Sequence, residues 1–230
     1  VMIAGGAESM SMVPMGGNKP SFNPEIFAKD ENVGIAYGMG LTAEKVAAQW
    51  KVSREAQDAF ALQSHQRALA AMKAGEFADE MTPVTVVERF PNLETGETGT
   101  RTRTVELDEG ARPDTSLEGL AKLKPVFAAK GSVTAGNSSQ TSDGAGALIV
   151  ASERAVKQFD LKPLAVFRSF AIRGVPPEIM GIGPIEAIPV ALKHAGLKLD
   201  DLGWIELNEA FAAQALAVIN TVGLDPAKRS

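Results

Sequence analysis

Cysteine is absent from the sequence, and histidine is scarce, with two residues among 230. The lack of cysteine excludes disulfide bonds and thiolate metal ligands from these residues, so covalent catalysis here would need another nucleophile. His65 has no carboxylate or second histidine at ligand spacing, and His194 suits the negative end of a helix dipole. We therefore expect no metal site. No apolar run reaches the roughly 18 residues that suggest a membrane span, and none is expected.

Neither sign of charge dominates the composition. The sequence has 23 basic and 28 acidic side chains and a net charge of -5, which offers no overall attraction to nucleic acid or to an anionic membrane. With 45% apolar and 22% charged residues, it is typical of a globular protein with one large domain or two small ones. An anionic ligand would need local basic residues. The candidates, which a solvated surface would explain equally well, are Arg112, Lys122, Lys124 and Lys130.

The segment Trp204–Ala217 is where we most expect chemistry, because a short apolar run turns directly into an apolar helix there. The run 204–207 is typical of the end of a buried strand. Asn208 is a good helix N-cap, and Glu209 suits the positive end of the helix dipole. A plain capped helix is one interpretation. The other is that a strand-to-helix turn at the carboxyl edge of a sheet projects the Asn208 amide into a ligand crevice.

Two further strand pairs are expected in the first 160 residues. The apolar run 145–151 predicts a strand buried on both faces that lies beside the strand 1–4. The segments 85–89 and 101–107 predict a hairpin with a polar tip. Helices are expected after Thr42 and after Ser53, because each of these residues is a good N-cap, and Gly75 should end the second. A short amphipathic helix is expected over 152–159.

From residue 164 a second series of alternating strands and helices is expected. An apolar strand over 164–172, a helix over 189–194, the strand 204–207 and the helix that follows alternate along the chain. This order predicts a parallel sheet with right-handed crossovers.

Four motifs then point to one family. They are GGAESMS at Gly5–Ser11, TAGNSSQTSDGA at Thr134–Ala145, MGIGP at Met180–Pro184 and NEAFAAQ at Asn208–Gln214. In this order they resemble a thiolase over essentially the whole chain. The resemblance implies an α/β protein with the layered α-β-α-β-α thiolase fold, present incompletely, and an inserted α+β loop domain. The implied boundaries are 1–10 with 133–160 for the N-terminal domain, 11–132 for the loop domain and 161–230 for the first part of the C-terminal domain.

The resemblance also implies the chemistry, which is acyl transfer through a reactive cysteine. That cysteine is expected ahead of Val1, and a second cysteine and a histidine beyond Ser230, so we expect an internal part of a longer polypeptide that is inactive alone. Coenzyme A is implied as a substrate and no permanently bound cofactor. Asn208 matches the asparagine that holds a water or an oxyanion position. The implied CoA and substrate contacts, several of which would also suit plain turns or core packing, are Met39, Arg112, Phe127, Ala135, Ser139, Met180 and Phe211.

Within the family, the SSQTSDGA form and the insert around Glu88–Val105 resemble the degradative 3-ketoacyl-CoA thiolases of fatty-acid beta-oxidation. Gly38 between Tyr37 and Met39 argues against the biosynthetic acetoacetyl-CoA branch, where a histidine stands, and Gly119 replaces a serine that sometimes contacts the nucleotide. That biosynthetic thiolase and a non-catalytic CoA-binding relative are the alternatives. A homodimer or homotetramer, a possible hydratase/dehydrogenase partner and a bacterial cytoplasmic location are expected, with an organellar location left open.

Overall fold

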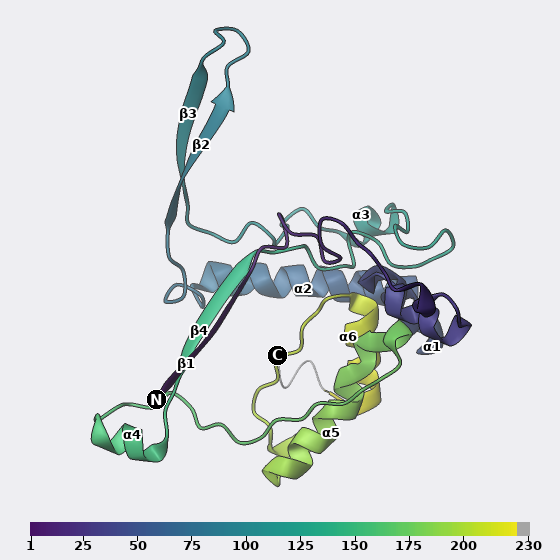
Figure 1. Cartoon of the computed structure of the whole chain (residues 1–230), viewed down its shortest axis with the longest axis vertical. Coiled ribbons are helices and arrows are strands. Elements are labelled where there is room, and N and C mark those ends of the chain that lie inside the picture. The colour runs from purple at the N-terminus through teal and green to yellow at the C-terminus, as the bar shows by residue number, and fades with distance from the viewer. Residues whose placement is uncertain (225–230) are drawn as a thin grey trace.

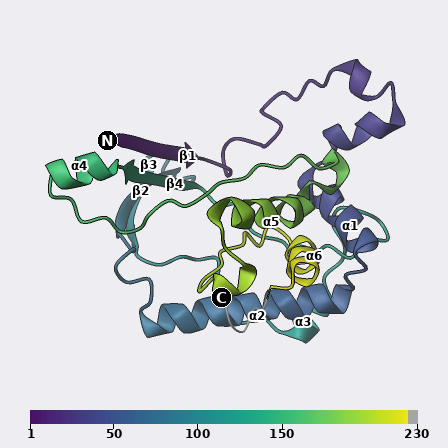
Figure 2. The same ribbon diagram turned by 90° about the horizontal axis from the view of Figure 1, so that it is seen from below.

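The longest helix, α2 (Arg54–Ala74), crosses the view of Figure 1 horizontally, and the turned view of Figure 2 shows that it lies along one edge of the molecule. The structure is a computed structural model that describes residues 1–224. The remaining α-helices are α1 (Met39–Gln49), α3 (Leu117–Ala121), α4 (Glu153–Gln158), α5 (Gly183–Ala195) and α6 (Ala212–Val222). The strands are β1 (Met2–Glu8), β2 (Val84–Pro91), β3 (Thr98–Val105) and β4 (Gly144–Val150). The 3-10 helices are η1 (Pro24–Ile26), η2 (Asp30–Ala36), η3 (Pro177–Ile182) and η4 (Leu199–Asp201).

Local capping signals set the ends of α2 as predicted. The Ser53 hydroxyl accepts the Ala56 backbone N–H at 3.2 Å, and Gly75 ends the helix with a φ of 76°, a conformation that glycine adopts without strain. The prediction that Thr42 caps α1 is wrong. Helical backbone already begins at Met39, so the Thr42 hydroxyl lies inside the helix and donates to the Met39 carbonyl at 2.8 Å.

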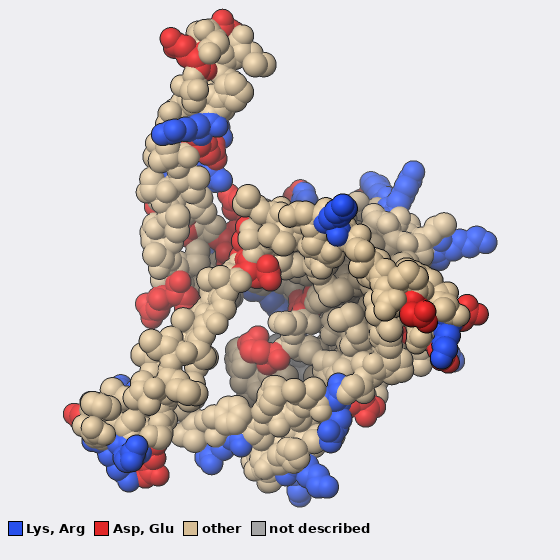
Figure 3. Space-filling model, viewed as in Figure 1, with Lys and Arg blue, Asp and Glu red and all other residues tan. Residues whose placement is uncertain are grey.

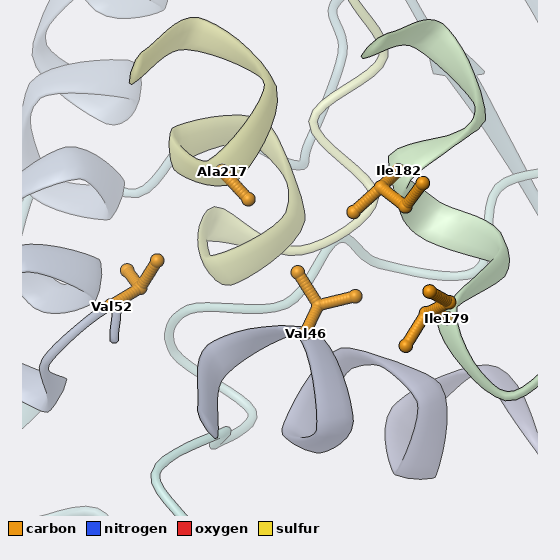
Figure 4. Close-up of a cluster of buried hydrophobic side chains, with 5 residues drawn as sticks. All are labelled: Val46, Val52, Ile179, Ile182 and Ala217. Carbon is orange, nitrogen blue, oxygen red and sulfur yellow. The ribbon is translucent and has the colours of Figure 1, made fainter. Parts of the chain in front are cut away.

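The apolar core lies where α1, η3 and α6 meet. One cluster joins Val46 of α1 and Val52 to Ile179, Ile182 and Ala217 (Figure 4). A second cluster joins the other side of α1 to Val133 and to Ala213 of α6. Helix α6 packs against α1, α2 and η3, and α5 packs against α6, as the turned view in Figure 2 also shows.

Both predicted strand pairs form, and each is a separate two-stranded antiparallel sheet. β1 pairs with β4 in the register Met2↔Val150, and β2 pairs with β3 in the register Val84↔Val105. The β2–β3 hairpin projects away from the helices (Figure 1). The expectation that the 145–151 strand is buried on both faces is wrong, because no element within residues 1–224 covers the β1–β4 sheet and Ile149 is 68% exposed.

The strands predicted at 164–172 and 204–207 do not form in the described residues. A strand exists only when its backbone N–H and C=O groups pair with a neighbouring strand, and no partner lies beside either segment within 1–224. Their apolar side chains are exposed to solvent, with 80% of the surface of Phe167 and 66% of that of Trp204 accessible. The predicted parallel sheet is therefore not formed by this part of the chain. None of the helices in the described residues is both long and apolar enough to cross a membrane.

Candidate functional site

A cleft opens beside α2, between α3 and the segments 134–142 and 207–212. It consists of two adjoining cavities of about 660 and 1310 Å³. Both are bordered by His65, Phe127, Ser138 and Ser139, so they adjoin along these residues. The smaller volume lies within the range of about 300–1,000 Å³ that is usual for ligand pockets, and the larger exceeds it.

Phe127 forms the wall that the two cavities share. Its ring lies directly on Gly40 of α1, where an added Cβ would stand 2.1 Å from a ring carbon. On another side it meets the ring of Phe211 at a centroid distance of 6.0 Å, edge to face. Only glycine lets the ring approach the helix this closely, so Gly40 and Phe211 together fix its place.

The loop 134–139 is held largely by its own side chains. The Asn137 Oδ1 accepts the Thr134 N–H at 2.8 Å, and the Ser138 hydroxyl donates to the Thr134 carbonyl at 2.6 Å. Thr134 and Asn137 are buried, while Ala135 and Ser139 are exposed along the cleft. The self-held turn that the sequence suggested is therefore present, and the same loop borders the cleft.

The same loop connects to the segment that carries Asn208. The Ser139 N–H donates to the Ala210 carbonyl at 2.9 Å, and the Ala212 N–H donates to the Asn137 carbonyl at 3.0 Å. The first turn of α6 is thus satisfied by the loop. Asn208 lies four residues before α6, so the prediction that it caps this helix is wrong; its exposed side chain instead borders the larger cavity.

Arg112 borders the smaller cavity from a segment that α2 holds in place. Its backbone N–H donates to His65 Nδ1 at 3.1 Å, and its guanidinium pairs with Asp114 at 3.5 Å. Hydrogen bonding from Arg112 holds the pKa of the Asp114 carboxyl below its ordinary value. The sequence offered no reason to place His65 at a site. Its only signal was its position on α2 next to Ser64, whose hydroxyl donates to Glu209 at 2.6 Å.

Of the residues predicted for the site, all but Met180 border the cleft. Arg112, Phe127, Ala135 and Ser139 surround the smaller cavity, while Met39, Asn208 and Phe211 border the larger one. Met180 lies on η3, between core residues Ile179 and Ile182, and borders neither cavity.

The other basic candidates do not gather at the cleft. Lys122 pairs with Glu118 at 2.6 Å on the exposed side of α3, and charges of both signs are scattered over the face in Figure 3. Within residues 1–224, no group of three or more His, Asp or Glu side chains could hold a metal ion.

The whole of this arrangement falls within two matches to one family. Residues 1–154 match the family model for the thiolase N-terminal domain, and residues 161–229 match that for the thiolase C-terminal domain. This chain belongs to the thiolase family. The resemblance drawn from the four motifs is confirmed, and the cleft is built from the thiolase TAGN and NEAF segments.

Curated relatives include two kinds of thiolase. The 3-ketoacyl-CoA thiolase of Bacillus subtilis is 50% identical over 228 residues, which is 98% of this chain and 57% of that relative. The acetyl-CoA acetyltransferase of Chromobacterium violaceum is 46% identical over 97% of this chain and 57% of its own length. The chain therefore spans somewhat more than half the length of these relatives.

Solved thiolase structures confirm the α/β thiolase fold. The human mitochondrial 3-ketoacyl-CoA thiolase in complex with CoA matches with a TM-score of 0.79 and 44% identity, over 99% of this chain and 56% of that one. The dimeric peroxisomal thiolase of Saccharomyces cerevisiae matches with a TM-score of 0.82 and 38% identity, over 99% of this chain and 55% of that one.

Proposed function

We propose that this chain supplies the CoA-binding part of a thiolase that cleaves 3-ketoacyl-CoA with free CoA, giving acetyl-CoA and a shortened acyl-CoA. The observation that carries the proposal is the cleft itself, where the TAGN loop and the NEAF segment meet through the Ser139–Ala210 and Ala212–Asn137 hydrogen bonds. The 50% identity to a 3-ketoacyl-CoA thiolase supports it.

Each cleft residue is assigned a role by its chemistry. The Phe127 ring offers a flat apolar surface for adenine, and the Arg112 guanidinium offers charge to the nucleotide phosphates. Ala135 and Ser139 line the smaller cavity and suit a slim amide-bearing pantetheine arm, because a small side chain leaves room and a hydroxyl can bond an amide. Phe211 is assigned a place beside the same arm, and Met39 contributes an apolar side chain to the larger cavity. Met180 lies outside the cleft, so its proposed role in lining the substrate pocket is supported only by the MGIGP motif.

Asn208 is assigned the electrostatic part of the chemistry. In thiolysis a thiolate attacks the 3-keto carbon, the C–C bond breaks to release the acetyl-CoA enolate, and CoA then takes the acyl group from the enzyme. An amide N–H aimed at the developing negative oxygen lowers the barrier of such steps. The 230 residues contain no cysteine, so the nucleophile of the acyl-cysteine cannot come from them.

The domain division and the assembly belong to the same proposal. Residues 1–10 with 133–160 form part of the N-terminal domain, 11–132 the loop domain that carries α1 to α3, and 161–230 the first part of the C-terminal domain. Of these, 225–230 lie outside the described residues. A homodimer or homotetramer in the bacterial cytoplasm is proposed, supported for the dimer by the yeast relative. A hydratase/dehydrogenase partner stays a prediction.

Biosynthetic acetoacetyl-CoA thiolase activity is the second candidate function, and the 46% identity to an acetyl-CoA acetyltransferase favours it. The long β2–β3 hairpin and Gly38 favour the degradative one. Comparing kcat/KM for acetoacetyl-CoA with that for a long 3-ketoacyl-CoA separates them, because only a degradative enzyme should prefer the long chain.

Three measurements test the proposal. Titration calorimetry of the purified protein with CoA should show one binding event, which tests the cleft without requiring turnover. The intact mass under denaturing conditions states whether the sample exceeds the 24.2 kDa of these residues. Thiolysis should be absent in a sample of 24.2 kDa. Turnover by such a sample would contradict the assignment of the nucleophile to a residue outside these 230. CoA binding without turnover in a heavier sample that contains cysteine and histidine would favour a non-catalytic binder.

A further inference from the structure

Asp58 is a carboxylate that is almost completely buried on the face of α2 turned toward the cleft, with 4% of its surface exposed. Both of its oxygens are occupied. Oδ2 accepts from Arg54 Nε at 2.8 Å, and Oδ1 accepts from Asn137 Nδ2 at 2.9 Å. Neither Asp58 nor Arg54 borders either cavity. A buried charge costs several kcal/mol in lost hydration unless it is well paired, and here both oxygens have a partner that belongs to a different part of the structure.

On one side, Asp58 fixes the wall made by α3. The Arg54 guanidinium, held by Asp58, also donates through Nη2 to the carbonyls of Leu120 at 2.6 Å and Leu123 at 2.9 Å. The side chains of these two leucines border the smaller cavity and press on the opposite loop. A Cβ added at Gly136 would stand 2.5 Å from each.

On the other side, Asp58 fixes the loop. Asn137 uses one amide hydrogen bond for Asp58, and its Oδ1 holds the Thr134 N–H. Its backbone carbonyl accepts the N–H of Ala212, the first residue of α6. Ala135 and Ser139, which face the cleft, are therefore linked to α3 through the Asp58 carboxylate, in addition to the direct packing of Leu120 and Leu123 against Gly136.

We propose that Asp58 is a positioning residue that sets the separation between the α3 wall and the 134–139 loop, and with it the affinity for CoA. It acts through Arg54 and Asn137 and touches no ligand. The inference rests on the proposed function, because it assigns Asp58 a role in that CoA site.

The hydrogen-bond donors that face Asp58 show which substitution tests the proposal. In Asp58→Asn, the new amide has one acceptor oxygen and one NH₂ group. Whichever way it turns, its NH₂ meets a donor, either Arg54 Nε–H or the Asn137 amide. Turning Asn137 as well only moves the conflict to the Thr134 N–H. One hydrogen bond is therefore lost, although the volume of the side chain is unchanged.

The exchange variant Asp58→Asn with Asn137→Asp removes the conflict. The oxygen introduced at position 58 accepts from Arg54, its NH₂ donates to the new carboxylate at position 137, and that carboxylate accepts the Thr134 N–H. The 3.2 Å bond from Asn137 Nδ2 to the Ser132 carbonyl is lost, and the new carboxylate oxygen faces that carbonyl oxygen, so recovery of the wild-type affinity is expected to be incomplete. A residue with a purely space-filling role would not respond to this exchange.

The experiment measures CoA binding by calorimetry and thermal unfolding for wild type, D58N, D58N/N137D and the surface control Asp79→Asn, which alters an exposed carboxylate just beyond α2. We expect the dissociation constant for CoA to rise about 10-fold in D58N, as it would if the wall and the loop kept their binding-competent spacing in only about a tenth of the molecules. In the exchange variant it should return to within about threefold of wild type, and the control should not change.

Two results overturn the inference. One is a D58N protein that melts earlier but binds CoA as wild type does. The other is an exchange variant that binds no better than D58N. If D58N does not fold, Arg54→Lys replaces it, since lysine keeps the charge but lacks the planar fork that reaches Asp58 and both carbonyls; unchanged CoA affinity in that variant overturns the inference too. A wild-type protein that binds no CoA defeats the proposed function instead, and hydrogen exchange of the 134–139 amides then still reports whether D58N loosens the loop.

Discussion

The ring of Phe127 meets the ring of Phe211 edge to face, with their planes at 82°. The contact joins two segments far apart in sequence, the one that follows α3 and the one that precedes α6. Edge-to-face pairs of this kind contribute about 0.5–1.5 kcal/mol beyond the area they bury. Because Phe127 also lies on Gly40, the position of the shared wall of the cleft depends on a residue of α1 that has no side chain.

Gly40→Ala should therefore move Phe127. Its Cβ would overlap the ring, and since overpacking typically costs 1–3 kcal/mol, we expect the free energy of unfolding to fall by about that amount. CoA affinity should fall with it. Urea unfolding and CoA titration measure the two effects. Gly183→Ala is the matched control, because Gly183 also lies in a helix, borders neither cavity, and a Cβ there meets nothing within 4 Å. Equal effects of both substitutions would contradict the role of Gly40.

Asn208→Ala should separate binding from turnover. If its amide stabilises a developing oxyanion, kcat for thiolysis should drop on the order of 100-fold while the dissociation constant for CoA stays close to wild type. The comparison is steady-state kinetics of the active enzyme beside Asn220→Ala, which changes an exposed asparagine near the end of α6. A variant with normal kcat would remove Asn208 from the chemistry.

His65→Ala removes the acceptor for the Arg112 N–H. The Arg112 segment should then lose its fixed place on α2, and we expect the dissociation constant for CoA to rise several-fold, in line with about 1 kcal/mol for one hydrogen bond. Calorimetry in the same buffer compares it with His194→Ala, the other histidine of the chain, which lies at the end of α5. Equal dissociation constants for CoA in the two variants would argue against a role for the hydrogen bond between His65 and Arg112.

Protonation of Asp143 is expected to weaken its contact with Ser11 at acidic pH. Hydrogen bonds from the side chain and backbone of Ser11 hold the pKa of Asp143 below its ordinary value. A lowered pKa means that the charged form stabilises the fold at neutral pH, and this contribution is lost as the pH falls through the lowered pKa. The Ser11 amide signal in NMR should change only below about pH 3.9, the ordinary value for Asp. A transition above that pH, or one that persists in Asp143→Asn, would count against the assignment.

Elements set by neighbours in sequence could be predicted, while those set by distant partners could not. The cap Ser53 and the stop at Gly75 are local signals, and each is found as expected. The short helix expected over 152–159 also forms, as α4. The start of α6 is not local, because the N–H of Ala212 is satisfied by Asn137. Asn208 therefore looked like the cap of a helix that begins four residues later.

The candidate site shows the same division. Residues carried by motifs, such as Ala135 and Ser139, could be identified from the sequence alone. Asp58 and His65 could not, because apolar periodicity marks the buried face of α2 by its alanines and gives no weight to polar residues on that face. Only the fold shows that these side chains point at loops about 50 to 80 residues away in the chain.

The β2–β3 hairpin stands clear of the cleft, and Glu94 is exposed at its tip. Because the 230 residues contain no cysteine, Glu94→Cys would introduce a thiol unique among them. A fluorophore or a surface tether attached there would report on or immobilise the molecule through a part that contacts no predicted ligand. The hairpin thus provides an attachment point for single-molecule measurements on residues that border neither cavity.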